Sequence, residues 1–338
     1  MKAVQLRAFH QPLELGEVAE PGPLGPQDVL IAVGAAGVCH KDVLIVEGFQ
    51  PRVVLPRTLG HEIAGRIEAI GSAVTGFRPG DRVCSLGYVT CGTCESCRSG
   101  RENLCRKRQW LGEELDGGYA QLVRSQAASL ARIPDSVTDD AAAVATCALS
   151  TVVHALQRLA RLQSGESVLV TGAAGAVGSN AILVAKAMGA RAIGADVPGK
   201  LDQITGADAV VPFGDSLAAS LKQLTGGEGV DVVVEAVGTP TMEQSLKTLR
   251  WGGRIVVIGN VKPNETVPLA LGSIILREVS ILGSMNATRA DLEEGLRLLD
   301  QGGLKPPTPT ILPLSAAQHA HDVLRQKKSV GKVILKPE

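Results

Sequence analysis

The part of the chain after residue 150 alternates apolar, strand-like runs with helical stretches in a regular rhythm. The runs are short and rich in Val, Ile and Ala, and they cover residues 167–171, 192–196, 209–213, 230–237, 254–259 and 279–283. Strands separated by helices pair in parallel, because each helix carries the chain back to the end of the sheet where it started. The rhythm therefore predicts an α/β fold with a doubly wound parallel sheet of six strands.

The first 150 residues have a different texture, in which short alternating runs are broken by Gly and Pro. This pattern predicts an irregular, mostly β domain with strands near 2–8, 29–33, 63–70, 81–85 and 119–123. The tail combines a helix-like stretch at 291–300, a Pro-rich turn at 305–309 and a last strand at 331–335. We expect the tail to return to the first domain. The predicted domains are then 1–147 with 289–338, and 148–288.

Charge and apolar content restrict the classes of function. The 338 residues include 34 basic and 34 acidic side chains with no block of five like charges, so neither a nucleic acid nor another polyanion is an expected partner. A small-molecule substrate fits this balance better. The longest apolar stretch, near 141–149, is too short to cross a bilayer, and the N-terminus lacks the apolar core of a secretory signal. The sequence thus predicts a cytoplasmic protein with no membrane partner.

Four of the seven cysteines crowd into one short segment: Cys91, Cys94, Cys97 and Cys105. The odd total and the crowding favour a reducing compartment and a metal over disulfides. Four thiolates at these spacings can surround one tetrahedral zinc ion and leave no open position, which predicts a structural zinc site. An iron–sulfur cluster and unrelated surface thiols are the alternatives. Cys84, in an apolar strand-like run, is predicted to serve packing.

A second, dispersed set consists of Cys39, His61 and Cys147. Two thiolates and one neutral imidazole cancel the charge of Zn²⁺ and leave a fourth position for water or a substrate oxygen, as in catalytic zinc sites. Asp42 is a candidate to orient His61, and Glu62 is a candidate transient ligand or nearby anion. Each of these residues taken alone is also compatible with a place in the core.

A glycine-rich turn links the run at 167–171 to a predicted helix at 177–188, with the spacing GxxGxxG formed by Gly172, Gly175 and Gly178. Backbone N–H groups and a helix N-terminus in this context bind a pyrophosphate. Asp196 ends the second strand, where a carboxylate accepts the ribose hydroxyls and repels a 2′-phosphate. We therefore expect NAD in preference to NADP, although nearby Lys200 and Arg191 leave NADP use open and a solvated loop acid is the alternative for Asp196.

These motifs together resemble those of the zinc-dependent medium-chain alcohol dehydrogenases over nearly the whole chain. The matching segments are GVCHKD at 37–42, GHE at 60–62, the four-cysteine segment, CALST at 147–151, the nucleotide fold and GKV at 331–333. The resemblance implies a Rossmann domain and a mostly β, GroES-like catalytic domain that is split between the two ends of the chain. It also implies a homodimer or homotetramer that forms when the strands at 279–283 of two nucleotide domains pair.

The same resemblance implies roles for individual residues. Cys39, His61 and Cys147 would hold the catalytic zinc, which brings the expected total to two zinc ions per chain. Thr151 would touch the nicotinamide, Asp196 would bind the ribose, and pyrophosphate contacts would come from His40 and Lys332.

Two positions depart from the family pattern. Typical relatives carry Ser or Thr two residues after the first cysteine ligand and His three residues later, where they relay a proton; here these positions are Lys41 and Leu44. Lys41 is interpreted as a proton donor, as a cation for an anionic substrate or cofactor, or as a plain surface lysine. The segments 48–52 and 110–119 are more similar to the archaeal acryloyl-CoA reductase branch of the superfamily.

The expected activity is hydride transfer between a nicotinamide cofactor and an alcohol/aldehyde or ketone pair, with zinc polarising the substrate oxygen. The alternative reaction is NAD(P)H-dependent reduction of an enoyl-CoA double bond. The alternative without catalysis is a nucleotide-binding redox sensor that keeps cofactor and zinc but turns over no substrate.

Overall fold

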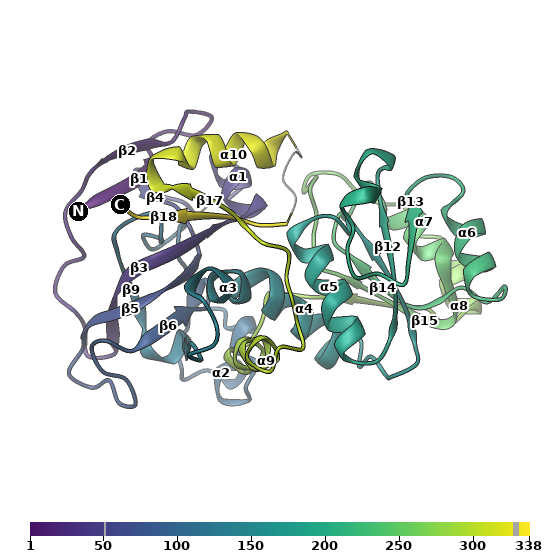
Figure 1. Ribbon diagram of the computed structural model, residues 1–338, viewed down its shortest axis with the longest axis horizontal. Helices are drawn as coiled ribbons and strands as arrows, with labels where there is room; N and C mark the ends of the chain where they lie inside the picture. The colour runs from purple at the N-terminus through teal and green to yellow at the C-terminus, as the bar shows by residue number, and fades with distance from the viewer. Residues whose placement is uncertain (51, 327–330) are drawn as a thin grey trace. The chain divides into compact units, whose positions relative to one another are not determined.

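The computed structural model describes residues 1–50, 52–326 and 331–338, and the chain divides into two compact units (Figure 1). The first unit contains residues 1–150, 287–301 and 308–338, and the second contains 151–286 and 302–307. The sequence placed the whole tail from residue 289 in the first domain, whereas the short segment 302–307 clusters with the second unit. This segment has no regular secondary structure beyond its initial turn and includes Pro306 and Pro307.

The second unit is built on one parallel sheet of six strands, which confirms the predicted doubly wound fold. The strands are β11 (Ser167–Thr171), β12 (Arg191–Asp196), β13 (Ala209–Pro212), β14 (Val230–Glu235), β15 (Leu249–Val257) and β16 (Ser280–Gly283). Their order is β13-β12-β11-β14-β15-β16, and every pairing is parallel. The order reverses direction beside β11, and ligands bind at such reversals in open α/β sheets. The glycine-rich turn follows β11 directly.

Helices cover both faces of this sheet. They are α5 (Ala176–Ala187), α6 (Leu217–Leu224), α7 (Met242–Thr248) and α8 (Leu271–Leu276). Figure 1 shows α5 on one side of the sheet and α6 and α7 on the other. The core between them is made of buried Val, Ile, Leu and Ala side chains such as Leu169, Ile193 and Val233, since aromatic residues are only 2% of the chain.

The first unit is mostly β, as predicted. Its main sheet has the order β10-β6-β5-β3-β18-β17, with β9 also pairing with β3. The bounds are β3 (Asp28–Val38), β5 (Glu62–Ile70), β6 (Arg82–Ser85), β9 (Leu122–Gln126), β10 (Leu130–Arg132), β17 (Thr310–Pro313) and β18 (Val333–Lys336). The last strand β18, yellow in Figure 1, lies antiparallel beside β3. The tail strand therefore returns to the sheet of the N-terminal region.

Smaller elements complete the first unit. A second sheet joins β1 (Lys2–Leu6), β2 (Glu14–Glu17) and β4 (Arg57–Thr58), and β7 (Tyr88–Val89) pairs with β8 (Gln109–Trp110). The helices are α1 (His40–Val46), α2 (Glu95–Arg98), α3 (Asp139–Val144), α9 (Arg289–Asp300) and α10 (Ala317–Arg325). The strand predicted at 119–123 was misplaced, because β9 begins only at Leu122. Tyr119 instead precedes the strand with its side chain fully buried.

A helical run from Asp139 to Leu159 is longer than the apolar stretch read from the sequence. It continues α3 through wide π-helical turns at Ala145–Leu149, α4 (Ser150–Val153) and a second π-helical segment at His154–Leu159. Its 21 residues and mean hydropathy of 1.2 meet the length and composition of a membrane span, but 78% of the apolar window is buried inside the structure. The run is therefore a core helix.

Candidate active site and metal centres

Four candidate ligands from three separate segments of the first unit meet at one point. Cys39 is the N-cap of α1, His61 and Glu62 stand where β5 begins, and Cys147 lies in the π-helical turn after α3. Their ligand atoms all lie within 4.8 Å of one another. π-helical turns often occur at functional sites, and this one carries Cys147. The structure thus assembles the predicted Cys–His–Cys set with Glu62 beside it.

Asp42 ties two of these ligands together. Its Oδ2 accepts the backbone N–H of Cys39 at 3.1 Å, which closes a capping box at the start of α1, and its Oδ1 lies 3.0 Å from His61 Nδ1. Burial disfavours the charged imidazole, but the charge and hydrogen bond of Asp42 outweigh it and raise the pKa of His61 to about 10. Because Nδ1–H is held by Asp42, Nε2 is the ring nitrogen that would lose its proton and bind a metal.

Of the two thiols of this site, Cys39 is prepared to bind a cation as a thiolate, whereas the hydrogen bond with Cys39 and burial raise the pKa of Cys147. A hydrogen bond with Cys147 holds the pKa of Cys39 well below its usual range against the opposing effect of burial, and the nearby Lys332 ammonium adds to the shift. A thiolate is the form that ligates zinc. Two sulfurs and one imidazole nitrogen match the donor set of a zinc ion that keeps one open position.

Glu62 and Lys332 form a buried ion pair at the edge of the site. Lys332 Nζ lies 2.5 Å from Glu62 Oε1, and the two side chains are 6% and 0% exposed. Burial raises the pKa of Glu62 to about 7, although Lys332 opposes this. Gly37 makes room for the carboxylate, because a Cβ there would stand 2.1 Å from Glu62 Oε2. The predicted contact of Lys332 with a pyrophosphate remains a prediction, since this structure engages Lys332 with Glu62.

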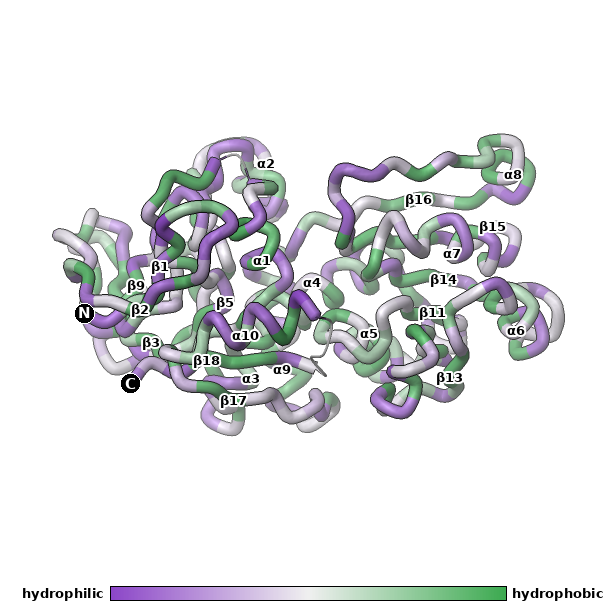
Figure 2. The backbone as a smooth tube through the Cα atoms, turned by 90° about the horizontal axis from the view of Figure 1, so that it is seen from above, coloured by the Kyte–Doolittle hydropathy of each residue, from purple (hydrophilic) through white to green (hydrophobic). Residues whose placement is uncertain are grey.

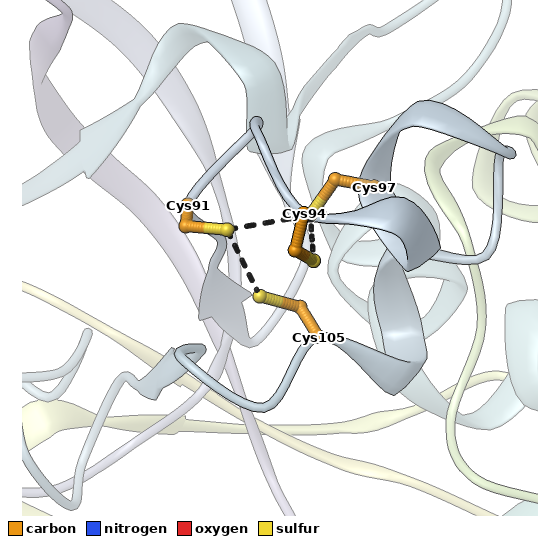
Figure 3. A group of neighbouring side chains, drawn as sticks. All are labelled: Cys91, Cys94, Cys97 and Cys105. Atoms are coloured by element: carbon orange, nitrogen blue, oxygen red, sulfur yellow. Dashed lines mark hydrogen bonds between the residues drawn. The ribbon is translucent and has the colours of Figure 1, made fainter.

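The four-cysteine segment folds into a compact cage in which the sulfurs converge (Figure 3). The Sγ–Sγ distances are 3.5 Å for Cys94–Cys97, 3.6 Å for Cys91–Cys105 and 3.9 Å for Cys91–Cys97. Four sulfurs at about 2.3 Å from a common zinc ion stand about 3.8 Å apart. Backbone N–H groups of Thr93 and Cys94 point at Cys91 and lower its pKa to about 6. The cage has the size and donors of a closed Cys₄ zinc site.

Cys84 is buried in β6 outside both clusters. Burial raises the pKa of its thiol, which keeps it neutral, in keeping with the packing role predicted for it.

Lys41 is already engaged by two neighbours. Its Nζ lies 2.6 Å from Oε1 of the buried Glu113 and 3.4 Å from the centre of the Trp110 ring. The ammonium itself has almost no exposed surface. A role as proton donor or anion clamp therefore requires the side chain to leave this cation–π and ionic contact. Neither contact partner was identified from the sequence.

In the second unit the glycine-rich turn has the geometry that close approach of a phosphate needs. Gly172 has a φ of +60°, and a Cβ on Gly178 would stand 2.2 Å from the carbonyl oxygen of Gly172. Gly175 is the N-cap of α5. Asp196 ends β12 beside this turn, and its Oδ2 accepts the N–H of Ala174 at 3.0 Å. The carboxylate thus braces the loop at the position expected for a ribose-binding acid.

The remaining predicted cofactor residues are placed as follows. His40 is the first residue of α1 and is half-buried, and Thr151 is a buried residue of α4. Their contacts with a cofactor remain predictions.

The sequence reasoning missed a buried acid at the end of β14. Glu235 is fully buried and accepts hydrogen bonds from the hydroxyls of Thr171, Thr241 and Ser245 at 2.7, 2.6 and 2.5 Å. It ties the ends of β11 and β14 together at the point where the strand order reverses. The signal available in the sequence was an acidic residue at the end of an apolar strand.

Comparisons with known proteins agree with this geometry. Residues 25–135 match the family model described as alcohol dehydrogenase GroES-like domain, and residues 176–301 match that of zinc-binding dehydrogenase. The chain is 42% identical over 337 residues to the acryloyl-coenzyme A reductase of Metallosphaera sedula, covering 99% of each chain. It is 36% identical over 345 residues to an alcohol dehydrogenase of Geobacillus stearothermophilus, again covering 99% of each.

Solved structures give the same answer. A NAD-dependent alcohol dehydrogenase superposes with a TM-score of 0.92 at 35% identity over 99% of both chains. The alcohol dehydrogenase of Aeropyrum pernix has a TM-score of 0.92 at 29% identity over 100% of both chains. The two domain matches, the full-length relatives and the assembled ligand set lead to one conclusion: the chain is an oxidoreductase that belongs to the zinc-dependent alcohol dehydrogenase family of medium-chain dehydrogenases.

Proposed function

We propose that the protein interconverts an alcohol with its aldehyde or ketone by hydride exchange with a nicotinamide cofactor. The observation that carries the proposal is the convergence of Cys39, His61 and Cys147 within 4.8 Å. Zinc held there supplies a Lewis acid that polarises the substrate oxygen. Asp42 orients His61, and Lys332 holds Glu62 by an ion pair, so the three ligands leave the fourth position to the substrate.

The metal content proposed is two zinc ions per chain, one in the closed Cys₄ cage and one in the open site. None of the seven cysteines forms a disulfide in the structure, which suits the reducing, cytoplasmic location that we propose. Elemental analysis of the purified protein tests the metal count. One metal per chain, or iron in place of zinc, would contradict it.

For the cofactor we propose NAD in preference to NADP, on the position of Asp196 beside the glycine-rich turn. The carboxylate repels a 2′-phosphate, so Asp196→Ser should shift the ratio of kcat/KM values toward NADP by about tenfold or more, which corresponds to roughly 1.4 kcal/mol. Steady-state kinetics with both cofactors measures the shift. Equal use of NADP by the unmutated enzyme would refute the assignment.

Enoyl-CoA reduction is the second candidate, favoured by two observations. The chain is 42% identical to a relative named acryloyl-coenzyme A reductase, and Lys41 and Leu44 replace the residues of the usual proton relay. Assays with alcohols, aldehydes and acryloyl-CoA, each followed by the absorbance of reduced nicotinamide, separate the two activities. Binding of NAD without turnover of any substrate class would instead favour the redox sensor.

Lys41→Met distinguishes the roles proposed for this lysine. A proton donor predicts a lower kcat and the loss of one limb of the pH–rate profile with little change in KM. An anion clamp predicts chiefly a higher KM for the cofactor or the CoA ester. Unchanged kinetics on every accepted substrate would leave Lys41 with only its structural contacts to Glu113 and Trp110.

We also propose a homodimer, or a tetramer built from such dimers, that forms through the open edge of the parallel sheet. Among the described residues, strand β16 pairs only with β15. Figure 2 shows apolar (green) backbone in the neighbouring helix α8, and Leu271, Ile275 and Leu276 of this helix are 64%, 72% and 72% exposed. An edge strand and an apolar patch of this kind require cover. Ile275→Asp should lower the mass measured by light scattering, whereas Val54→Asp, at a similarly exposed residue of the first unit, should not. A monomeric unmutated protein would refute the proposal.

A further inference from the structure

The hydroxyl of Tyr119 lies one hydrogen bond beyond the pair formed by Asp42 and His61. It donates to Asp42 Oδ2 at 2.9 Å, and both side chains are fully buried. The same carboxylate accepts the N–H of Cys39 and faces His61 Nδ1. Of the three groups that hydrogen-bond to Asp42, the Tyr119 hydroxyl is therefore the one that does not belong to a candidate metal ligand. Its role is not to bind the metal but to hold the residue that orients the ligands.

Tyr119 is fixed to the segment that leads into His61. Its backbone N–H donates to the carbonyl oxygen of Leu59 at 2.9 Å, and the N–H of Gly118 donates to the carbonyl oxygen of Gly60 at 2.8 Å. Gly60 has a φ of +94°, and a Cβ there would stand 2.4 Å from a carbon of the Tyr119 ring. Glycine at 60 lets the ring lie against the backbone immediately before the histidine ligand. The hydroxyl thus has little freedom to leave Asp42.

His321 closes the other side of the tyrosine. The two rings meet edge to face with centres 5.9 Å apart, and His321 Nε2 lies 3.5 Å from the hydroxyl. Burial lowers the pKa of His321, and burial together with Asp42 raises the pKa of Tyr119 well above its usual value. The tyrosine therefore stays protonated, and the charged carboxylate is its stronger acceptor.

We infer that Tyr119 is a positioning residue of the catalytic metal centre: through Asp42 it fixes the His61 ring and the Cys39 end of α1, and so slows the loss of zinc from this site alone. The inference rests on the proposed function, because it requires a zinc ion at the open site. A second layer of donors that orients metal ligands contributes roughly 10–100-fold to metal affinity. Tyr119 acts through Asp42 and so lies one layer further from the metal, and we expect it to have a smaller effect on zinc binding.

The test compares Tyr119→Phe with Tyr88→Phe. Tyr88 is also fully buried in the first unit, and its hydroxyl donates to the carbonyl of Ala287 instead of to Asp42. Each variant therefore loses one buried hydroxyl, together with its hydrogen bond to Asp42 in Tyr119→Phe and to Ala287 in Tyr88→Phe. The measured quantity is the rate at which each zinc ion is released to the chelator 4-(2-pyridylazo)resorcinol. Visible spectra of the cobalt-substituted proteins report the ligand geometry.

We expect Tyr119→Phe to release one of its two zinc ions about threefold to tenfold faster than the unmutated chain and to shift the cobalt bands of the open site. Asp42→Asn should release this zinc faster still, and Tyr88→Phe should release it at the unmutated rate. Unchanged release and spectra in Tyr119→Phe, or equal acceleration in Tyr88→Phe, overturn the inference. A single zinc in the unmutated chain overturns the proposed metal centre as well, which separates the two failures.

Discussion

The two candidate metal sites of the first unit are built in opposite ways. The Cys₄ cage takes all its ligands from one loop, residues 91 to 105, whereas the open site collects Cys39, His61 and Cys147 from three separate segments. In the cage, local backbone N–H groups of Thr93 and Cys94 lower the pKa of Cys91. The open site instead depends on side chains brought in from a distance, such as Tyr119 and Lys332.

From this difference we expect the closed site to stabilise the fold and the open site to perform chemistry. Four thiolates leave a zinc ion no room for a substrate, so the energy of the closed site contributes to folding. Three ligands leave room for a substrate, and the buried residues around these ligands set the charge at the open position. Substitutions in the two sites should therefore damage different properties.

The largest expected effect is on turnover at the open site. Cys39→Ser removes a thiolate ligand and should lower kcat on the order of a thousandfold, the scale of losing a stabiliser of transition-state charge. The zinc content should fall by one per chain with little change in unfolding temperature. Cys84→Ala, at a buried cysteine outside both sites, should keep both zinc ions. Comparable loss of turnover in Cys84→Ala would remove the distinction.

Substitutions in the closed site should lower the stability of the protein and leave turnover largely unchanged. Cys94→Ser should lower the free energy of unfolding by about 3 kcal/mol or more, because a structural zinc contributes folding free energy. For a chain of 338 residues the unfolding temperature should then fall by roughly 4 °C or more. Calorimetry measures this, and activity below the transition should be largely retained. A variant as stable as the unmutated chain but inactive would reverse the assignment of the two sites.

Chelation should distinguish the sites by rate. The open coordination position admits a bidentate chelator, whereas the closed cage must first lose a thiolate. With 1,10-phenanthroline we expect the first zinc to leave at least about tenfold faster than the second, with activity falling in step with the first. Activity that follows the slower zinc would contradict this order.

The smallest expected effect concerns the space around Glu62. Gly37→Ala places a methyl group where the carboxylate stands, which should cost about 1–3 kcal/mol of stability as overpacking and disturb the open site. Gly16→Ala is the matched control, since a Cβ there has no neighbour within 4 Å. Denaturant unfolding of both variants measures the difference. Equal stabilities would show that Glu62 moves aside at no cost.

The sequence predicted most reliably the features that depend on residues close together in the chain. The six strands of the second unit follow from a rhythm of apolar runs, and the structure places strands at all six positions. The Cys₄ cage was predictable for the same reason, since its spacing alone brings four sulfurs together. The start of β9 was misplaced by three residues, because the apolar run at 119–123 contains Tyr119, whose side chain turns into the core instead of following the strand.

The sequence by itself thus determined the fold class, the closed metal cage and the residue types of the open site. Only the tertiary structure decided which side chains surround that open site. The antiparallel register of β3 with β5 sets Gly37 opposite Glu62, and the return of β18 brings Lys332 to the same carboxylate. Strand register and chain return are set by packing over the whole sheet, so contacts between residues far apart in the chain leave no local pattern to read.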